Sequence, residues 1–314
     1  MSMPKPVAAR LSLKHLRLIA AIAEHRQLSV AASVLSITQP AASRSLAEVE
    51  AMVGAALFER HPRGMRATLP GEGLARRARL ILDEVGRAAE EVGQLRQGRG
   101  GVVRIGTVTG AAVGYVVPAI RQLMATAPGV EIHVEVATSD ELAAGLSAMR
   151  LDIMLGRIPA AARPGDFAVQ RAGGERVRLI AGAGHRLAGQ ARVALADLAG
   201  DAWIMQGPGA PIRRAVEDGF LDQGLAPPAR VINSASLLVT LAMLREDDVV
   251  TPVSQEVAGL LTGAQGNLVI LPFGPEITVA PYSLVTLRNR SLSPAAARCH
   301  ALLSQALREG PARS

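Results

Sequence analysis

The chain has 314 residues and a mass of 32.7 kDa, a length that corresponds to two domains of about 100–200 residues each. Hydrophobic residues make up 49% and charged residues 19%, which excludes an intrinsically disordered chain. No apolar run reaches the ~18 residues of a membrane span, and the first residues lack the apolar core of a secretory signal. The single cysteine excludes an internal disulfide and a cysteine-based zinc site. We therefore expect a protein of the cytoplasm without a membrane segment.

The net charge is unevenly distributed along the chain. The formal charge of the whole chain is +7. Residues 1–80 contain 12 Lys and Arg against 5 Asp and Glu, a net charge of +7, whereas residues 81–314 contain 22 of each sign. This asymmetry indicates a head that binds a polyanion and a neutral body. A basic face that is only solvated would give the same charge.

Helical patterns fill the first 54 residues. Apolar residues at helical spacing predict a first helix over residues 13–23. Ser29 is expected to cap a short second helix over residues 30–35. Thr38 is expected to cap a third helix that has Pro40 in its first turn, where a missing N–H costs little. Gly54 is expected to end this third helix.

Two short extended segments flank a Pro-Gly turn within residues 57–66, which predicts a small hairpin. Thr68 is expected to cap a long helix that runs to about Gln97. Its apolar residues recur at spacings of four and three, as in a coiled-coil seam. This seam predicts pairing with a second copy of the chain, and packing on the chain's own domain is the alternative. The seam residues are Leu74, Ala78, Ile81, Val85, Ala88, Val92 and Leu95.

The pattern changes after a glycine-rich, hinge-like segment at residues 98–101. Short apolar runs then alternate with helical stretches. This alternation predicts an α/β body with largely parallel strand pairing, and its length indicates two lobes. The predicted strands span residues 102–105, 131–136, 151–155, 177–181, 202–205, 230–232, 249–251, 268–271 and 283–287.

The polar face of the third helix has the chemistry of a helix that reads DNA. Two short helices, a turn and a helix with a polar N-terminal face fit a helix-turn-helix. A Gln side chain can bond adenine bidentately, with its amide C=O accepting and its NH2 donating, and an Arg side chain can bond guanine or a phosphate. The candidate contacts are Gln39, Pro40, Ser43 and Arg44 on the helix and the hairpin arginines Arg60, Arg63 and Arg66 beside the DNA backbone.

Beyond this pattern, residues 28–71 resemble the signature of LysR-type transcriptional regulators. The resemblance rests on LSVAA at 28–32, LSITQPAASR at 35–44 and GAALFER at 54–60. Arg63-Gly64 and Thr68-Leu69-Pro70-Gly71 continue it. Pro70 departs from the family, which more often has a small non-proline residue there, but Pro is tolerated in a first helical turn. Chain length, the long helix and the α/β remainder also look like this family.

The resemblance implies a transcriptional regulator that is not an enzyme and needs no cofactor or metal. It implies a winged helix-turn-helix at residues 1–70, a dimerising linker helix and hinge at 71–100, and an effector-binding domain at 101–314. The last would resemble the type 2 periplasmic-binding-protein fold, with lobe I at about 101–168 plus 272–314 and lobe II at about 169–271. Such regulators usually form homotetramers, bind double-stranded promoter DNA and, as activators, act on RNA polymerase.

The resemblance assigns the helix and hairpin residues named above to DNA contacts, and each has a structural alternative. Gln39 and Ser43 can cap or solvate the helix. Arg60 can pair with Glu59 or Glu50, and Arg66 can be an ordinary surface residue.

The effector is expected between the lobes, because ligands of such folds bind at the carboxyl ends of strands and at helix starts. Free N–H groups there favour anions, and Arg157 can hold a carboxylate, so we expect a small organic anion. A loose likeness to LysR members that control sugar or aromatic-acid catabolism agrees with this. Ordinary helix caps and a structural salt bridge at Arg157 are the alternatives. The candidate effector residues are Thr107, Thr109, Thr138, Ser139, Arg157, Gln206, Asn233, Ser234 and Thr251.

Two other classes of protein compete with this interpretation. A solute-binding protein would lack the basic head and would carry an export signal. An enzyme would need a catalytic constellation, and the sequence contains no GxSxG, HExxH or phosphate-loop motif. His133 is expected to face water or to pack rather than to bind a metal, and Trp203 and Cys299 are expected to be buried.

Overall fold

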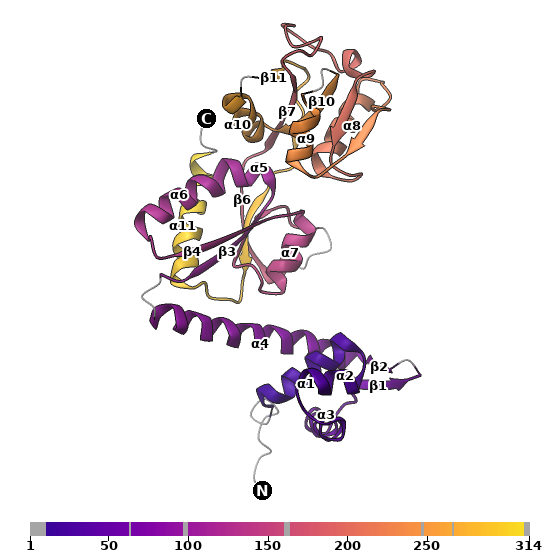
Figure 1. Ribbon diagram of the computed structural model, residues 1–314, viewed down its shortest axis with the longest axis vertical. Helices are drawn as coiled ribbons and strands as arrows, with labels where there is room; N and C mark the ends of the chain where they lie inside the picture. Colours follow the sequence, from indigo (N-terminus) through magenta and orange to yellow (C-terminus); the bar gives the residue numbers. More distant parts are fainter. Residues whose placement is uncertain are drawn as a thin grey trace. The chain divides into compact units, whose positions relative to one another are not determined.

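The computed structural model describes residues 11–62, 64–96, 100–159, 164–245, 248–265 and 267–310. The chain forms two compact units, Met1–Gln97 and Gly98–Ser314 (Figure 1). The N-terminal unit contains α1 (Leu13–His25), α2 (Leu28–Val34), α3 (Gln39–Val53), β1 (Phe58–His61), β2 (Gly64–Ala67) and α4 (Leu69–Arg96). The three predicted helices, the hairpin and the long helix are therefore present.

The residues at the helix ends determine where α1, α2 and α3 begin and end in the sequence. Arg26 adopts the left-handed conformation (φ 54°) and ends α1, so α2 begins almost at once, after Gln27. The prediction that Ser29 caps this helix is wrong, because Ser29 lies inside the first turn. Thr38 caps α3 as predicted, with its hydroxyl accepting from the Ala41 N–H, and Gly54 ends α3 at φ 75°.

The wing, which we define as β1, β2 and their turn, is fastened to the helices by close backbone contacts. The Met65 N–H donates to the Arg26 carbonyl at 2.7 Å. A Cβ on Gly64 would lie 2.2 Å from that same carbonyl oxygen. On the other side, Thr68 donates to the Leu57 carbonyl, and a Cβ on Gly71 would lie 1.9 Å from it. Glycine is therefore required at both positions.

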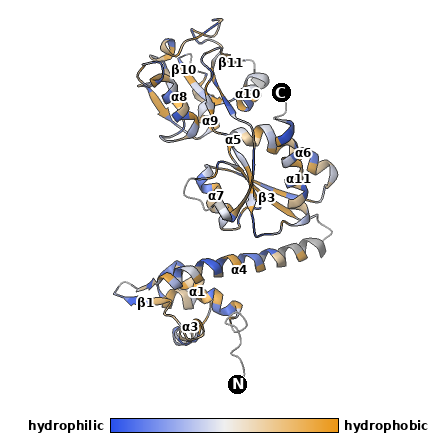
Figure 2. Ribbon diagram, turned by 180° about the vertical axis from the view of Figure 1, so that it is seen from behind, coloured by the Kyte–Doolittle hydropathy of each residue, from blue (hydrophilic) through white to orange (hydrophobic). Residues whose placement is uncertain are grey.

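Helix α4 has two different halves. Its first half packs on α1, where Ala78 is fully buried with Leu16 and Ala20. Leu74 also packs against the core of the unit, so the prediction that all seven seam residues await a partner is wrong for these two. Farther along, Ile81, Val85 and Val92 are 45%, 42% and 58% exposed, and Ala88 is exposed too. The side chain of Leu95 lies outside the described residues. Figure 2 shows hydrophobic and hydrophilic segments alternating along this helix.

The C-terminal unit contains two sheets and the helices that cover them. Lobe I holds a sheet in the order β4-β3-β5-β13-β6, and lobe II holds a sheet in the order β11-β7-β10-β8-β9, with β12 paired to β7. The lobe I elements are β3 (Val102–Thr107), α5 (Thr109–Ala111), a π-helical turn (Ala112–Val116), α6 (Val117–Thr126), β4 (Glu131–Val136), α7 (Ser139–Ser147), β5 (Ile153–Gly156), a 3-10 turn (Pro164–Asp166), β6 (Phe167–Arg171), β13 (Ser283–Leu287) and α11 (Pro294–Glu309). The lobe II elements are β7 (Glu175–Gly182), a 3-10 turn (Leu195–Leu198), β8 (Ala202–Met205), α8 (Pro211–Leu221), β9 (Val231–Asn233), α9 (Leu237–Met243), β10 (Val249–Ser254), α10 (Gln255–Gln265), β11 (Leu268–Leu271) and β12 (Thr278–Val279).

Strand direction is more mixed than predicted. The pairs β3–β4, β3–β5, β8–β9 and β8–β10 are parallel, but β7 and β13 run antiparallel to their neighbours. The strand that follows each crossing between the lobes, β7 at the first and β13 at the second, runs opposite to the parallel strands of its sheet, and apolar periodicity alone does not reveal strand direction. The second crossing also comes later than expected: Ile277 and β12 belong to lobe II, so residues 272–279 were assigned to the wrong lobe.

Each lobe has its own core, and the predicted buried residues lie there. Trp203 is fully buried in lobe II, where it meets Phe220 edge to face. Cys299 is fully buried in lobe I, and burial raises the pKa of its thiol to about 12, which keeps it unreactive. The side chain of His133 is 55% exposed on β4, as predicted.

Two glycines in the first turns of α4 give a matched test of the wing contact. We expect Gly71→Ala to lower the free energy of unfolding by about 1–3 kcal/mol, because the new methyl group meets a backbone carbonyl that cannot rotate away. Gly73→Ala meets no atom within 4 Å and is expected to stabilise the helix by up to about 1 kcal/mol. Urea unfolding followed by circular dichroism measures both. Equal stability of the two variants would contradict the contact.

Candidate nucleic-acid interface and effector pocket

The first two turns of α3 present a polar, accessible face. Gln39, Pro40 and Arg44 are exposed and Ser43 is half-buried. The opposite face is anchored in the core, where Ala42 and Val49 are fully buried. The Thr38 cap satisfies one N–H of the first turn. The cap is therefore Thr38 and not Gln39 or Ser43, which leaves the latter two side chains available for contacts outside the chain.

The wing carries arginines that no described acidic residue neutralises. Register pairs Glu59 with Arg66 and Arg60 with Met65, but no described carboxylate lies within 4.0 Å of either guanidinium. Glu50 is occupied elsewhere: its Oε1 accepts from the Leu57 N–H at 2.7 Å and from the Phe58 N–H at 3.2 Å. The alternative in which Glu50 pairs with Arg60 is thus wrong. Arg63 lies outside the described residues.

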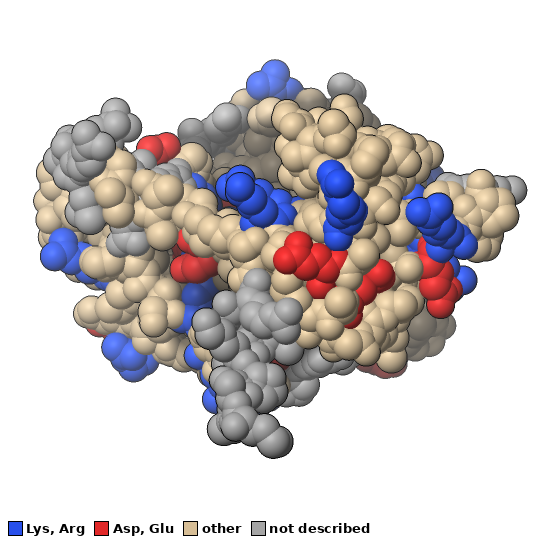
Figure 3. Space-filling model, turned by 90° about the horizontal axis from the view of Figure 1, so that it is seen from below, with Lys and Arg blue, Asp and Glu red and all other residues tan. Residues whose placement is uncertain are grey.

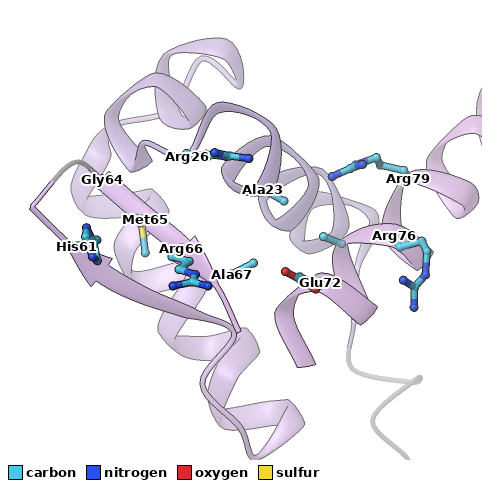
Figure 4. A pocket seen from close by; sticks show the side chains of 11 residues that line it. Ala23, Arg26, His61, Gly64, Met65, Arg66, Ala67, Glu72, Arg76 and Arg79 are labelled. Carbon is cyan, nitrogen blue, oxygen red and sulfur yellow. The ribbon is translucent and has the colours of Figure 1, made fainter. Parts of the chain in front are cut away.

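A hollow of about 660 Å³ lies between the wing, the end of α1 and the first turns of α4. We call it the wing cleft and define it by Arg26, His61, Arg66, Glu72, Arg76 and Arg79. In Figure 4, Arg26 and Arg79 point toward one another, and Glu72 extends from α4 toward the wing. The cleft thus gathers arginines from three elements.

On the face seen from below, Lys and Arg side chains stand in separate groups, with Asp and Glu side chains near several of them (Figure 3). The positive charge on that face is therefore divided among particular residues and does not form one uniformly basic patch.

The C-terminal unit has a pocket between its lobes. Thr109 and Gly110 line it from lobe I, and the ends of β8 and β10 with the start of α9 line it from lobe II. Four predicted residues lie there: Thr109, Gln206, Ser234 and Thr251. The Thr251 hydroxyl donates to the Ile204 carbonyl at 2.9 Å, so it retains lone pairs for a ligand. We call this hollow the interlobe pocket.

Four other predicted residues have structural roles and do not line this pocket. The Thr107 hydroxyl is buried and donates to the Val108 carbonyl. Thr138 and Glu141 form a capping box on α7. Ser139 accepts from the Arg157 N–H at 3.0 Å, and Asn233 accepts from Arg213. For these residues the alternative of local capping or bonding describes the structure better than a ligand contact.

Arg157 is held at the junction of the lobes. Its guanidinium donates to Glu175, the first residue of β7, and to the Ala280 carbonyl at 2.8 Å. It also lies 5.9 Å from the centre of the Tyr282 ring. Glu175 is 3% exposed; burial raises the pKa of its carboxyl, and Arg157 opposes that rise. The salt-bridge alternative is therefore the observed state of Arg157.

Sequence reasoning missed part of the interlobe pocket. Ser254 lines it and accepts from the Val257 N–H at the start of α10. The signal was present, because Ser254 ends a strand, but we ended that strand at Thr251. Gly110 was missed as well: a Cβ there would lie 2.6 Å from Glu175 Oε1 and 2.7 Å from Ser254 Oγ. This close approach of three distant segments is not visible in the sequence.

No three His, Cys, Asp or Glu side chains gather as metal ligands would, within the residues that the structure describes. In the same part of the chain, each helix is too short or too polar to cross a lipid bilayer.

The Arg157–Glu175 pair makes a prediction about stability. Arg157→Met is expected to cost about 3–5 kcal/mol, because it leaves a buried carboxylate unpaired. The cost should shrink as the pH is lowered, because burial raises the folded-state pKa of Glu175 above its ordinary value and protonation removes the buried charge. Urea unfolding measures both effects. The double variant Arg157→Met/Glu175→Gln should recover part of the stability lost in Arg157→Met. If the double variant instead loses the sum of the two single-variant losses, the pairing is contradicted.

Comparison with known proteins identifies the family of both units. Residues 13–72 match the family model described as "Bacterial regulatory helix-turn-helix protein, lysR family", and residues 96–308 match "LysR substrate binding domain". The chain is 43% identical over 289 residues to the HTH-type transcriptional regulator GbpR of Rhizobium radiobacter, covering 91% of this chain and 94% of that protein. It is 39% identical to GbpR of Azospirillum brasilense, covering 95% and 87%.

Solved structures agree on the fold. Full-length CbnR complexed with its target DNA has a TM-score of 0.63 at 22% identity, covering 94% of this chain and all of that one. A full-length OxyR variant from Pseudomonas aeruginosa has a TM-score of 0.61 at 20% identity, covering 97% and 98%. With both domain models matched along one chain and named regulators as relatives, the protein belongs to the LysR family of bacterial helix-turn-helix transcriptional regulators.

Proposed function

We propose that this LysR-type regulator reads the bases of promoter DNA with the first turns of α3 and contacts the sugar-phosphate backbone of the DNA with the wing. The supporting observation is the exposed polar face at Gln39, Pro40, Ser43 and Arg44, on the unit that carries the excess positive charge. A helix with one face anchored and the other polar can enter the major groove. Because bacterial DNA lies in the cytoplasm, we expect the protein to act there.

Each residue has a distinct role in this proposal. The Gln39 amide bonds an adenine edge, and the Arg44 guanidinium bonds a guanine or a phosphate. Ser43 bonds a base or backbone oxygen, and Pro40 makes an apolar contact while leaving no N–H to satisfy. The wing arginines Arg60, Arg63 and Arg66 meet backbone phosphates, which fix register without reading sequence.

The effector in this proposal is a small organic anion in the interlobe pocket. Hydroxyl and amide groups of Thr109, Gln206, Ser234 and Thr251 face it from both lobes. No Lys or Arg appears among the described residues that line this pocket, so hydroxyls and free N–H groups must meet the charge of the anion. Arg157 does not contact the effector directly in this proposal, because its guanidinium is already paired with Glu175.

Assembly completes the proposed mechanism. The exposed stripe at Ile81, Val85, Ala88 and Val92 supports a dimer through α4, since an apolar face of this kind is stable when a partner covers it. Two dimers form the homotetramer. A two-fold dimer reads a two-fold site, and effector binding changes the spacing of the heads and hence contact with RNA polymerase. A coupling of about 1–3 kcal/mol suffices for such a switch.

Arg44 provides the test of the DNA-binding part. We expect Arg44→Ala to weaken binding to the DNA upstream of the protein's own gene by about 1–3 kcal/mol, because a bidentate base contact is lost. Fluorescence anisotropy with labelled duplex measures the affinity. Arg17→Ala, which removes an exposed arginine from α1, is the control and should bind as the wild type does. An unchanged affinity in Arg44→Ala would refute the assignment.

Two threonines test the effector part. Calorimetry with a panel of organic carboxylates should find a binder, and Thr109→Val should weaken it about tenfold, because a pocket hydroxyl is removed without loss of volume. Thr138→Val should leave the affinity unchanged and reduce only stability, because Thr138 caps α7 away from the pocket. If no carboxylate binds while neutral polyols do, the anion assignment fails and the pocket assignment stands.

A further inference from the structure

The wing cleft is a hollow lined mainly by basic side chains. Its lining includes four arginines from three elements: Arg26 at the end of α1, Arg66 on β2, and Arg76 and Arg79 on α4. Glu72 is the single carboxylate among the described residues of the lining, and all five side chains are exposed. Four guanidinium groups around one hollow repel each other unless an anion joins them.

Within the chain, the described carboxylates do not supply that anion. None of them lies within 4.0 Å of the four guanidinium groups, Glu72 included. The volume of the cleft is about 660 Å³. This volume is large enough for several anionic groups to lie side by side. The uncompensated positive charge of the cleft matches an external ligand that carries several negative charges.

We propose that the wing cleft binds phosphates of the DNA backbone that lie outside the bases read by α3. The proposal rests on the DNA-binding function proposed above and extends it to Arg26, Arg76 and Arg79. Guanidinium groups bind phosphate oxygens in pairs of parallel hydrogen bonds. The cleft shares Arg66 with the wing, so the same strand that meets the backbone near the recognised bases also forms one wall of the cleft.

The backbone contacts of the wing make the cleft a fixed part of the DNA-binding surface. The carbonyl of Arg26 accepts from the Met65 N–H, so the backbone at Arg26 is held beside β2, the strand that carries Arg66. A duplex carries one negative charge per about 1.7 Å of its axis. DNA that continues past the wing and bends toward α4 presents successive phosphates to Arg26, Arg79 and Arg76. Bending of flanking DNA is thereby stabilised by contacts that read no base.

An acidic segment of a second copy is the competing occupant, and the cleft favours DNA over it. An acidic side chain brings one charge and must be spaced from the next by the polypeptide, whereas neighbouring phosphates supply a row of charges without interruption. The two occupants can be told apart by experiment. Removing contacts to DNA changes the salt dependence of DNA binding, whereas removing contacts to a second copy changes the oligomeric state.

The test compares the full-length double variant Arg76→Gln/Arg79→Gln with Arg77→Gln. Arg77 lies on the same helix and is exposed, but it does not line the cleft. Glutamine keeps most of the side-chain stem, so both proteins should fold like the wild type, as thermal unfolding will report. Binding is measured by anisotropy on two duplexes, one that ends at the outermost base pairs read by α3 and one that extends about one helical turn farther on each side.

On the extended duplex, the double variant should bind about tenfold or more weakly than the wild type. The slope of log K against log salt should fall by about 1–2, close to 0.9 per lost phosphate contact. On the short duplex, its affinity should match that of Arg77→Gln, which should equal the wild type on both.

Three outcomes would overturn the proposal. An unchanged affinity and salt slope on the extended duplex removes any role of the cleft in DNA binding. An equal loss on both duplexes, together with dissociation in sedimentation velocity, assigns the cleft to a second copy of the chain. If Arg77→Gln also weakens DNA binding, the effect comes from the total positive charge of the helix and not from the cleft. None of these results is confused with failure of the proposed function, because in that case the wild type itself binds neither duplex.

Discussion

The DNA-binding unit depends on two points at which backbone meets backbone without room for a side chain. Gly64 lies against the Arg26 carbonyl, and Gly71 lies against the Leu57 carbonyl. These contacts fix the wing to the turn between α1 and α2 on one side and to the start of α4 on the other. As a result, the backbone of the wing has a fixed position relative to the end of α1 and the start of α4, the elements that form the wing cleft with it. The glycines of the sequence motif thus have a physical reason that is independent of any family resemblance.

The effector unit is organised around a different kind of constraint, a charged pair at the junction of its lobes. Arg157 comes from lobe I and Glu175 begins the first strand of lobe II. Gly110 lets the start of α5 approach that carboxylate, and Ser254 joins from the start of α10. The interlobe pocket shares Gly110 and Ser254 with this cluster. The interlobe pocket and the Arg157–Glu175 pair are therefore neighbours, so a ligand placed in the pocket would meet residues that also contact the pair linking the lobes.

The sequence predicted the elements well where local chemistry decides the structure. The Thr38 cap, the Gly54 end, the hairpin and the length of α4 follow from capping, turn residues and periodicity, and all are present. The prediction failed where tertiary contacts decide. Ala78 carries the right spacing for a dimer seam yet is buried by α1, and β12 joins lobe II because Thr278 pairs with β7. Ser, Thr and Asn residues that follow strands predicted the pocket lining only in part. The same residue types also cap helices, as Thr138 does.

The central claim is that the N-terminal unit binds a defined operator as a two-fold assembly, with backbone contacts that extend beyond the recognised bases. Hydroxyl-radical footprinting on the DNA upstream of the protein's own gene tests this most directly, because it reports protection of each sugar along both strands. The account predicts two protected half-sites related by symmetry and separated by whole helical turns, each continuing into flanking DNA on the wing side. Uniform cleavage at protein concentrations that retard the same fragment in a gel would contradict it, because the binding would then be unspecific.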